Sequence, residues 1–168
     1  MTSEHSGDYV YVAPARNGRG LFVRVLMHRE DRLLEVRGKI IDYEALDRAG
    51  GSVQDNAFRF GPETYLSPEG ELGDFLNHSC EPNAKVVKEG EQLFIVAVGD
   101  IPADTEVTID YATIIASDDI WEMACSCGSA HCRGRIASYT LLPADVQERY
   151  IKEGMIPQYI VDISASER

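Results

Sequence analysis

The sequence lacks the run of about eighteen apolar residues that a membrane-spanning helix requires, and residues 1–8 lack the apolar stretch of a secretory signal. Basic residues are also scarce: 16 Lys and Arg stand against 28 Asp and Glu, for a net charge of -12. Direct binding to nucleic-acid phosphates depends on basic side chains. We therefore expect neither membrane association nor direct nucleic-acid binding, whereas a basic protein partner suits the charge.

Repeats, low-complexity tracts and long linkers are absent as well. The 168 residues, 44% of them hydrophobic and 26% charged, suit one folded domain with a small appendage. Without a secretory signal, a reducing compartment is the default expectation. Because no basic cluster resembles a nuclear import signal, we expect the protein in the cytoplasm and keep the nucleus as the alternative. The oligomeric state stays open.

Short apolar stretches separated by glycine and proline predict a chain of β-strands. The expected strands are residues 9–12, 21–25, 33–36, 39–41, 58–60, 64–66, 84–87, 92–98 and 107–111. Only residues 43–47 suggest a short helix inside this region. The strands therefore predict a mostly β fold with short helices.

The character of the sequence changes near Pro143, which suits the first turn of a helix. Val146, Tyr150 and Ile151 would share one face of that helix, and Gly154 would end it. We divide the chain accordingly into four parts. These are a flexible tail at 1–8, a β domain at 9–115, a cysteine-rich segment at 116–138 and a helical extension at 139–168.

All four cysteines of the chain enter one metal-site prediction. Cys125, Cys127 and Cys132 lie within eight residues, and Gly128 permits the tight backbone that would bring their thiolates together. Zinc prefers four such ligands in a tetrahedron, and Cys80 is the remaining thiol. A closed site of this kind is structural because it leaves no position for a reactive water.

Two alternatives to this ligand set stay open. His131 is chemically able to replace one thiolate, although its position beside Cys132 makes convergence awkward. In the second alternative, the cysteines are buried or free thiols that bind no metal.

Residues 77–83, with the sequence NHSCEPN, resemble the most diagnostic motif of SET-domain lysine methyltransferases. In that family the cysteine of this motif completes a zinc site with a post-SET loop of pattern C-x-C-x4-C, matched by residues 125–132. Residues 17–22 (NGRGLF) resemble the family's glycine motif, and residues 106–111 (EVTIDY) its tyrosine motif. The resemblance covers most of residues 9–138.

This resemblance implies a SET-domain β-fold with a pseudoknot, a post-SET zinc loop and a C-terminal helical extension. It also implies transfer of a methyl group from S-adenosylmethionine to a lysine in a basic protein, such as a histone, or in a peptide, with Tyr111 as the catalytic residue. The implied cofactor-binding residues are Asn17, Gly18, Arg19, Gly20, Leu76, Asn77, His78 and Tyr111. The implied zinc ligands, for one structural Zn²⁺, are Cys80, Cys125, Cys127 and Cys132.

The sequence departs from the family pattern near the expected lysine channel. Val36 and Ile109 stand where aromatic residues are common, so a second hydroxyl would have to come from Tyr65 or another tyrosine. Asp74 and Ile136 also differ from the usual arginine and aromatic residue. These departures leave the number of added methyl groups open. They also motivate two alternatives: an idle module that binds the cofactor or a protein partner, and a zinc-stabilised interaction domain without cofactor.

Overall fold

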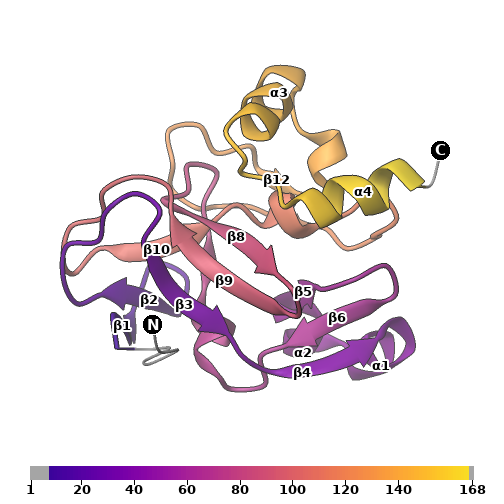
Figure 1. Cartoon of the computed structure of the whole chain (residues 1–168), viewed down its shortest axis with the longest axis horizontal. Coiled ribbons are helices and arrows are strands. Elements are labelled where there is room, and N and C mark those ends of the chain that lie inside the picture. Colours follow the sequence, from indigo (N-terminus) through magenta and orange to yellow (C-terminus); the bar gives the residue numbers. More distant parts are fainter. Residues whose placement is uncertain (1–7, 167–168) are drawn as a thin grey trace.

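The computed structural model of the protein describes residues 8–166, which form mainly short β-strands (Figure 1). The strands are β1 (Val10–Pro14), β2 (Arg19–Val23), β3 (Arg32–Val36), β4 (Lys39–Asp42), β5 (Phe58–Arg59), β6 (Thr64–Ser67), β7 (Asn77–His78), β8 (Ala84–Glu89), β9 (Gln92–Ala97), β10 (Glu106–Ile109), β11 (Met123–Ala124) and β12 (Arg135–Ile136). The helices are α1 (Tyr43–Ala49), α2 (Gly51–Asn56), α3 (Ala144–Lys152) and α4 (Gln158–Ser166), with 3-10 turns η1 (Leu72–Phe75), η2 (Tyr111–Ile114) and η3 (Tyr139–Leu141). The predicted fold class, mostly β with short helices, is confirmed. The predicted tail lies, apart from Asp8, outside the described residues.

The first sheet has the strand order β1-β2-β10-β7, which places β10 between two strands that are distant in sequence. β1 and β2 form an antiparallel hairpin, and Gly18 in its turn has a φ of 73°, which glycine adopts at no steric cost. β10 runs antiparallel to β2 and parallel to β7, with Thr108 opposite Asn77 and Ile109 opposite His78. The three motifs that resemble those of the SET family therefore lie in or beside neighbouring strands.

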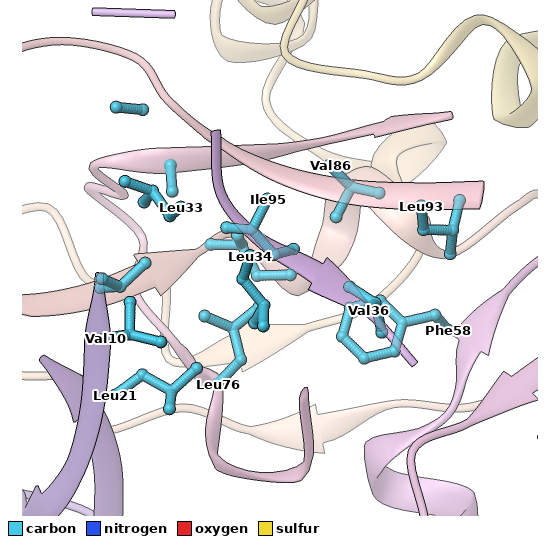
Figure 2. Packing of buried hydrophobic residues seen from close by; sticks show 14 of the residues in the cluster. Val10, Leu21, Leu33, Leu34, Val36, Phe58, Leu76, Val86, Leu93 and Ile95 are labelled. Carbon is cyan, nitrogen blue, oxygen red and sulfur yellow. The ribbon is translucent and has the colours of Figure 1, made fainter. Parts of the chain in front are cut away.

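The main hydrophobic core lies between this sheet and a three-stranded sheet of order β3-β9-β8. Figure 2 shows the side chains of Val10 and Leu21 on one side of the core and those of Leu34 and Ile95 on the other. Val36 belongs to the same core and is buried. The residue at the position where the family often has a tyrosine therefore contributes apolar packing.

A third sheet of order β4-β6-β5 carries the two short helices α1 and α2. The helix predicted at 43–47 is confirmed as α1, whose start is capped by Asp42 through a hydrogen bond from the Ala45 N–H at 2.8 Å. Helix α2 was not predicted from the sequence. Its residues are mostly polar, none is buried, and they show no apolar period.

The predicted strand at 107–111 ends earlier in the structure, at Ile109. Tyr111 is the first residue of η2, and the side chain of Asp110 caps this turn by accepting the Ala112 N–H at 3.0 Å. The expectation that Tyr111 ends a strand is therefore wrong. An apolar pattern does not reveal a cap made by the acidic residue inside it.

The C-terminal helices cover a second hydrophobic cluster, which is separate from the main core (Figure 1). Helix α3 confirms the helix predicted after Pro143, and Tyr150 on it is buried. Ile151 was expected on the same buried face, but it is 52% exposed because it lies one residue, and so about 100°, further around the helix. Helix α4 follows Pro157 and was not predicted as a separate element. Within residues 8–166, no helix has the length and apolar character needed to cross a membrane.

The second cluster yields a stability prediction. Ile160 on α4 is 0% exposed, so truncation to alanine leaves a cavity and should lower the free energy of unfolding by about 2–5 kcal/mol. Urea denaturation followed by circular dichroism measures the change. Ile151→Ala is the matched control, because its side chain is half exposed and its loss should cost less than about 1 kcal/mol. Equal effects of the two substitutions would contradict the assigned packing.

Candidate functional site

The side chain of Asn77 ties the glycine-containing hairpin to the middle of the first sheet. Its Nδ2 donates to the backbone carbonyl of Arg19 at 3.0 Å and to Glu106 Oε1 at 2.8 Å. A Cβ at Gly20 would collide with the same Glu106 carboxylate, so a larger residue here would displace the carboxylate that Asn77 contacts. At Gly18 an added Cβ would meet no atom within 4 Å, and the residue is exposed. The backbone at the hairpin turn is therefore open to a ligand.

A second polar side chain, that of Asn83, holds β10 from its other edge. Its Oδ1 accepts the Thr108 N–H at 2.9 Å, and its Nδ2 donates to the Glu106 carbonyl at 2.8 Å. One amide thereby satisfies two backbone groups of a short strand, which would otherwise need a neighbouring strand. Asn83 is the last residue of the NHSCEPN motif, so the motif also positions the strand that leads to Tyr111.

Tyr111 is held in place by its hydroxyl and by two neighbouring rings. The hydroxyl donates to the Leu76 carbonyl at 2.5 Å, and the ring centroid lies 5.3 Å from that of His78 and 6.4 Å from that of Trp121. Burial, reinforced by the negative charges of Asp55 and Glu106, raises the pKa of Tyr111 well above its ordinary value. The hydroxyl therefore keeps its proton at neutral pH and is fixed as a donor to Leu76.

Tyr111 lines a cavity with about 730 Å³ of empty volume, part of which is open to solvent. Tyr65, proposed from the sequence as the source of a second hydroxyl, lines the same cavity and donates to Asp119 Oδ1 at 2.6 Å. Ile109 instead belongs to the main core and is 0% exposed. Trp121 contributes the largest ring to the cavity wall. The cavity is thus aromatic even though Val36 and Ile109 are not.

An ion cluster supports one wall of this cavity. The side chain of Arg59 is 2% exposed and donates to both carboxylate oxygens of Asp118, at 2.8 and 2.9 Å. It also lies 3.0 Å from Asp119. Sequence reasoning did not single out these residues. The available signal was a charged residue inside the apolar stretch 58–60, because a charge is buried only when it is paired.

The four cysteines, which are unbridged, gather at one end of β7. Cys125 Sγ lies 3.8 Å from Cys80 Sγ and 3.7 Å from Cys132 Sγ. Four sulfurs placed about 2.3 Å from a central zinc are separated from one another by about 3.8 Å. The sulfur atoms of Cys80, Cys125 and Cys127, together with a ring nitrogen of His78, lie within 4.8 Å of one another. The cluster can therefore hold a metal ion.

Both nearby histidines have other partners. His78 Nδ1 accepts the Tyr111 N–H at 3.0 Å, so Nε2 carries the ring proton and faces Cys80 Sγ at 3.4 Å. Burial lowers the pKa of His78 to about 4, and the ring is neutral at physiological pH. His131, the alternative ligand, is exposed, and its Nδ1 lies 2.7 Å from Glu81 Oε1. Geometry thus favours the thiols as ligands and His78 as a hydrogen-bond donor to one of them.

A buried carboxylate links the cysteine loop to Tyr111. Asp110 has a side chain that is 0% exposed and is bound by Arg133 through two contacts of 2.8 Å, one to each carboxylate oxygen. Tyr150 on α3 donates to the same group at 2.9 Å. The backbone N–H of Arg133 also lies 3.4 Å from Cys80 Sγ. Three parts of the chain therefore converge on Asp110.

The sequence model of the SET domain matches residues 18–112, which include most of the glycine motif, the NHSCEPN motif and Tyr111. The chain belongs to the SET-domain family. This confirms the resemblance on which the site prediction depends, while the individual site residues stay predictions.

Among curated relatives, this SET domain is similar to the H3 lysine-4 specific histone-lysine N-methyltransferase of Emericella nidulans. The two are 30% identical over 127 residues, which cover 68% of this chain and 10% of the relative. The protein of the same description from Saccharomyces cerevisiae is 36% identical over 83 residues, covering 46% of this chain and 8% of the relative. Histone-lysine N-methyltransferase ASHH2 of Arabidopsis thaliana is 30% identical over 152 residues, covering 80% and 9%. The chain thus spans about a tenth of the length of these relatives.

The ion pair inside this SET domain gives a second prediction. Arg133→Met should lower the free energy of unfolding by about 3–5 kcal/mol, because it leaves the Asp110 charge buried and without its cation. Arg135→Met is the matched control: it removes an ion pair with Glu122 whose side chains are 58% and 57% exposed. That pair should contribute less than about 1 kcal/mol. Chemical denaturation with zinc in excess checks both values, and equal losses would refute the assignment.

Proposed function

We propose that this chain is a methyltransferase that uses S-adenosylmethionine to methylate a lysine side chain in a basic protein. The observation that carries the proposal is the placement of Tyr111. Its protonated hydroxyl is anchored to Leu76, and its ring packs against His78 of the NHSCEPN motif and lines the aromatic cavity. The relatives named above are all histone-lysine methyltransferases, which supports this function.

The residues of the glycine hairpin fit the proposed cofactor. The exposed backbone at Gly18 permits the close approach of a ligand, and the guanidinium of Arg19 suits the carboxylate at the methionine end of S-adenosylmethionine. Asn77 fixes the Arg19 carbonyl, so this segment is organised before a ligand arrives. We assign cofactor binding to Asn17, Gly18, Arg19 and Gly20 together with Leu76, Asn77, His78 and Tyr111. When bound, S-adenosylmethionine supplies a methyl group activated by its positive sulfur.

The chain's own residues then position the acceptor. A lysine ammonium must lose a proton to solvent before its nitrogen can form the new bond to carbon, and the carbon–sulfur bond breaks as that bond forms. Tyr111 cannot take this proton as a phenolate because its own pKa is raised. Its oxygen instead offers lone pairs that accept an N–H of the amine, while the hydroxyl keeps its own proton and donates it to the Leu76 carbonyl. Orientation, rather than general-base catalysis, is its contribution.

We propose a lysine-rich segment such as a histone tail as the substrate. The net charge of -12 favours the approach of such a segment, and two of the relatives are described as specific for lysine-4 of histone H3. The peptide would lie beside the cavity, as an added strand next to the short edge strand β5. Residues 9–115 would form the catalytic domain, with 116–138 as the metal-binding segment and 139–168 as a supporting extension.

We also assign one structural Zn²⁺ to Cys80, Cys125, Cys127 and Cys132. The Cys80–Cys125 and Cys125–Cys132 sulfur separations match those of a tetrahedral zinc site, and the role of the ion would be to fix the loop rather than to activate water. Two N–H groups, from His78 Nε2 and the Arg133 backbone, face the Cys80 sulfur and would stabilise its negative charge.

A second candidate function is an idle SET module that binds the cofactor or a protein partner. It is favoured by one observation: Val36 and Ile109 pack in the main core, so neither places a polar group in the cavity. The two functions separate in one assay, since only the first yields radiolabelled histone from labelled S-adenosylmethionine.

For the metal, we expect about one zinc per chain in protein purified without chelator. Cys80→Ser should lower the zinc content to less than about half an equivalent, because an alcohol replaces the thiolate that joins the loop to β7. Elemental analysis measures both. His131→Ala is the control and should keep its zinc, since that ring contacts Glu81. Full zinc in Cys80→Ser would remove Cys80 from the site.

For catalysis, Tyr111→Phe should slow methyl transfer to histones by on the order of 10²-fold or more, because the oriented oxygen is lost from a dry site. Single-turnover rates at saturating cofactor measure this, and calorimetry should show that cofactor affinity is largely kept. Tyr139→Phe is the control, because Tyr139 is buried in the second cluster, away from the cavity. An undiminished rate in Tyr111→Phe would make Tyr111 a packing residue only.

A further inference from the structure

The cavity beside Tyr111 is lined by three charged side chains, and two of them are already paired with each other. These are Asp55, Arg59 and Asp119. The guanidinium of Arg59 is bound to both Asp118 and Asp119. Asp119 further accepts the Tyr65 hydroxyl at 2.6 Å and the Ala116 N–H at 2.8 Å. Each of these two carboxylates, Asp118 and Asp119, therefore already has a cationic partner, although one guanidinium faces both.

Asp55 is different because its charge has no counterion. It lies in the last turn of α2, at the exposed edge of the cavity, and among residues 8–166 no basic side chain lies within ion-pair distance of it. One carboxylate oxygen, Oδ1, accepts the Trp121 Nε1–H at 2.9 Å. The other oxygen is available at the cavity mouth. Its field extends inward, since Asp55 is one cause of the raised pKa of Tyr111.

The hydrogen bond to Asp55 also fixes the indole of Trp121 in the cavity wall. The indole ring is tilted by 55° to Tyr111, with centroids 6.4 Å apart. A carboxylate next to two aromatic rings is an arrangement that binds a cation, because the ring faces and the carboxylate are both negative. A neutral amine or an aliphatic chain gains no charge interaction from it.

We infer that Asp55 and Trp121 together recognise the substrate lysine as an ammonium ion at the mouth of the cavity. This inference rests on the proposed function and names the residues that select the substrate's charge. The lysine would enter as a cation held by Asp55 and lose its proton to solvent before its nitrogen reaches Tyr111. Asp55 is thus a specificity-determining residue and takes no part in bond formation.

A single probe reports on this site. Trp121 is the only tryptophan of the chain, so its fluorescence and its indole N–H resonance monitor the cavity mouth without labelling. The titrants are Nα-acetyl-lysine methylamide and Nα-acetyl-norleucine methylamide, which have the same linear side-chain carbons but differ in the ammonium group. We expect wild-type protein to bind the lysine derivative at least about fivefold more tightly.

Two matched variants separate the effect of the Asp55 charge from that of the net charge. Asp55→Asn keeps an oxygen that can accept the Trp121 N–H but removes the negative charge, and it should abolish the preference for the lysine derivative. Asp47→Asn changes the net charge equally at an exposed position on α1 and should keep the preference. Circular dichroism verifies that both variants are folded.

The inference is overturned if wild-type protein binds both derivatives equally, if neither derivative perturbs Trp121, or if Asp55→Asn retains the preference. Loss of the preference in Asp55→Asn alone supports it. Methyl transfer is not needed for this titration. Failure of the proposed function would instead appear as the absence of labelled histone with wild-type protein, so the two failures are distinguishable.

Discussion

The buried carboxylate of Asp110 is the interaction on which the arrangement of the site depends. A charge with a side-chain exposure of 0% is tolerated only when it is fully paired. Arg133 contacts both of its oxygens, Tyr150 donates to one of them and the Ala112 N–H donates to the other. These partners come from the cysteine loop, the C-terminal extension and the turn that carries Tyr111. The three segments are therefore assembled around one group.

This arrangement places the cysteine cluster and the cavity within one network. Arg133 follows Cys132 directly, and Asp110 precedes Tyr111, so their ion pair connects a proposed metal ligand to the proposed catalytic residue across two peptide bonds. His78 adds a second connection, since its ring accepts the Tyr111 N–H on one side and faces Cys80 on the other. A displacement of the cysteine loop would thus shift Tyr111 through packed, hydrogen-bonded groups.

The sequence was most informative where function depends on local motifs. The NHSCEPN segment, the cysteine loop and Tyr111 could all be located, because their residue types and spacing are specific. The roles of Asp55, Arg59 and Trp121 in the cavity wall could not be predicted, because these side chains bind partners that are distant in sequence. Helix α2 was missed for a related reason, since its exposed polar residues carry no periodic signal.

The position of β10 between β2 and β7 also has a consequence for how the chain reaches its native state. Both neighbours of β10, the antiparallel β2 and the parallel β7, precede it in the sequence. The strands β8 and β9 lie between β7 and β10, so the first sheet is completed only after this intervening segment has been placed. Pairings at such sequence separation slow folding. During synthesis, β7 can pair with β10 only after β10 has emerged from the ribosome. Cys80 and Cys132 can come together only later, because Cys132 follows β10 in the sequence. A metal ion would therefore bind last, after β7 and β10 have paired.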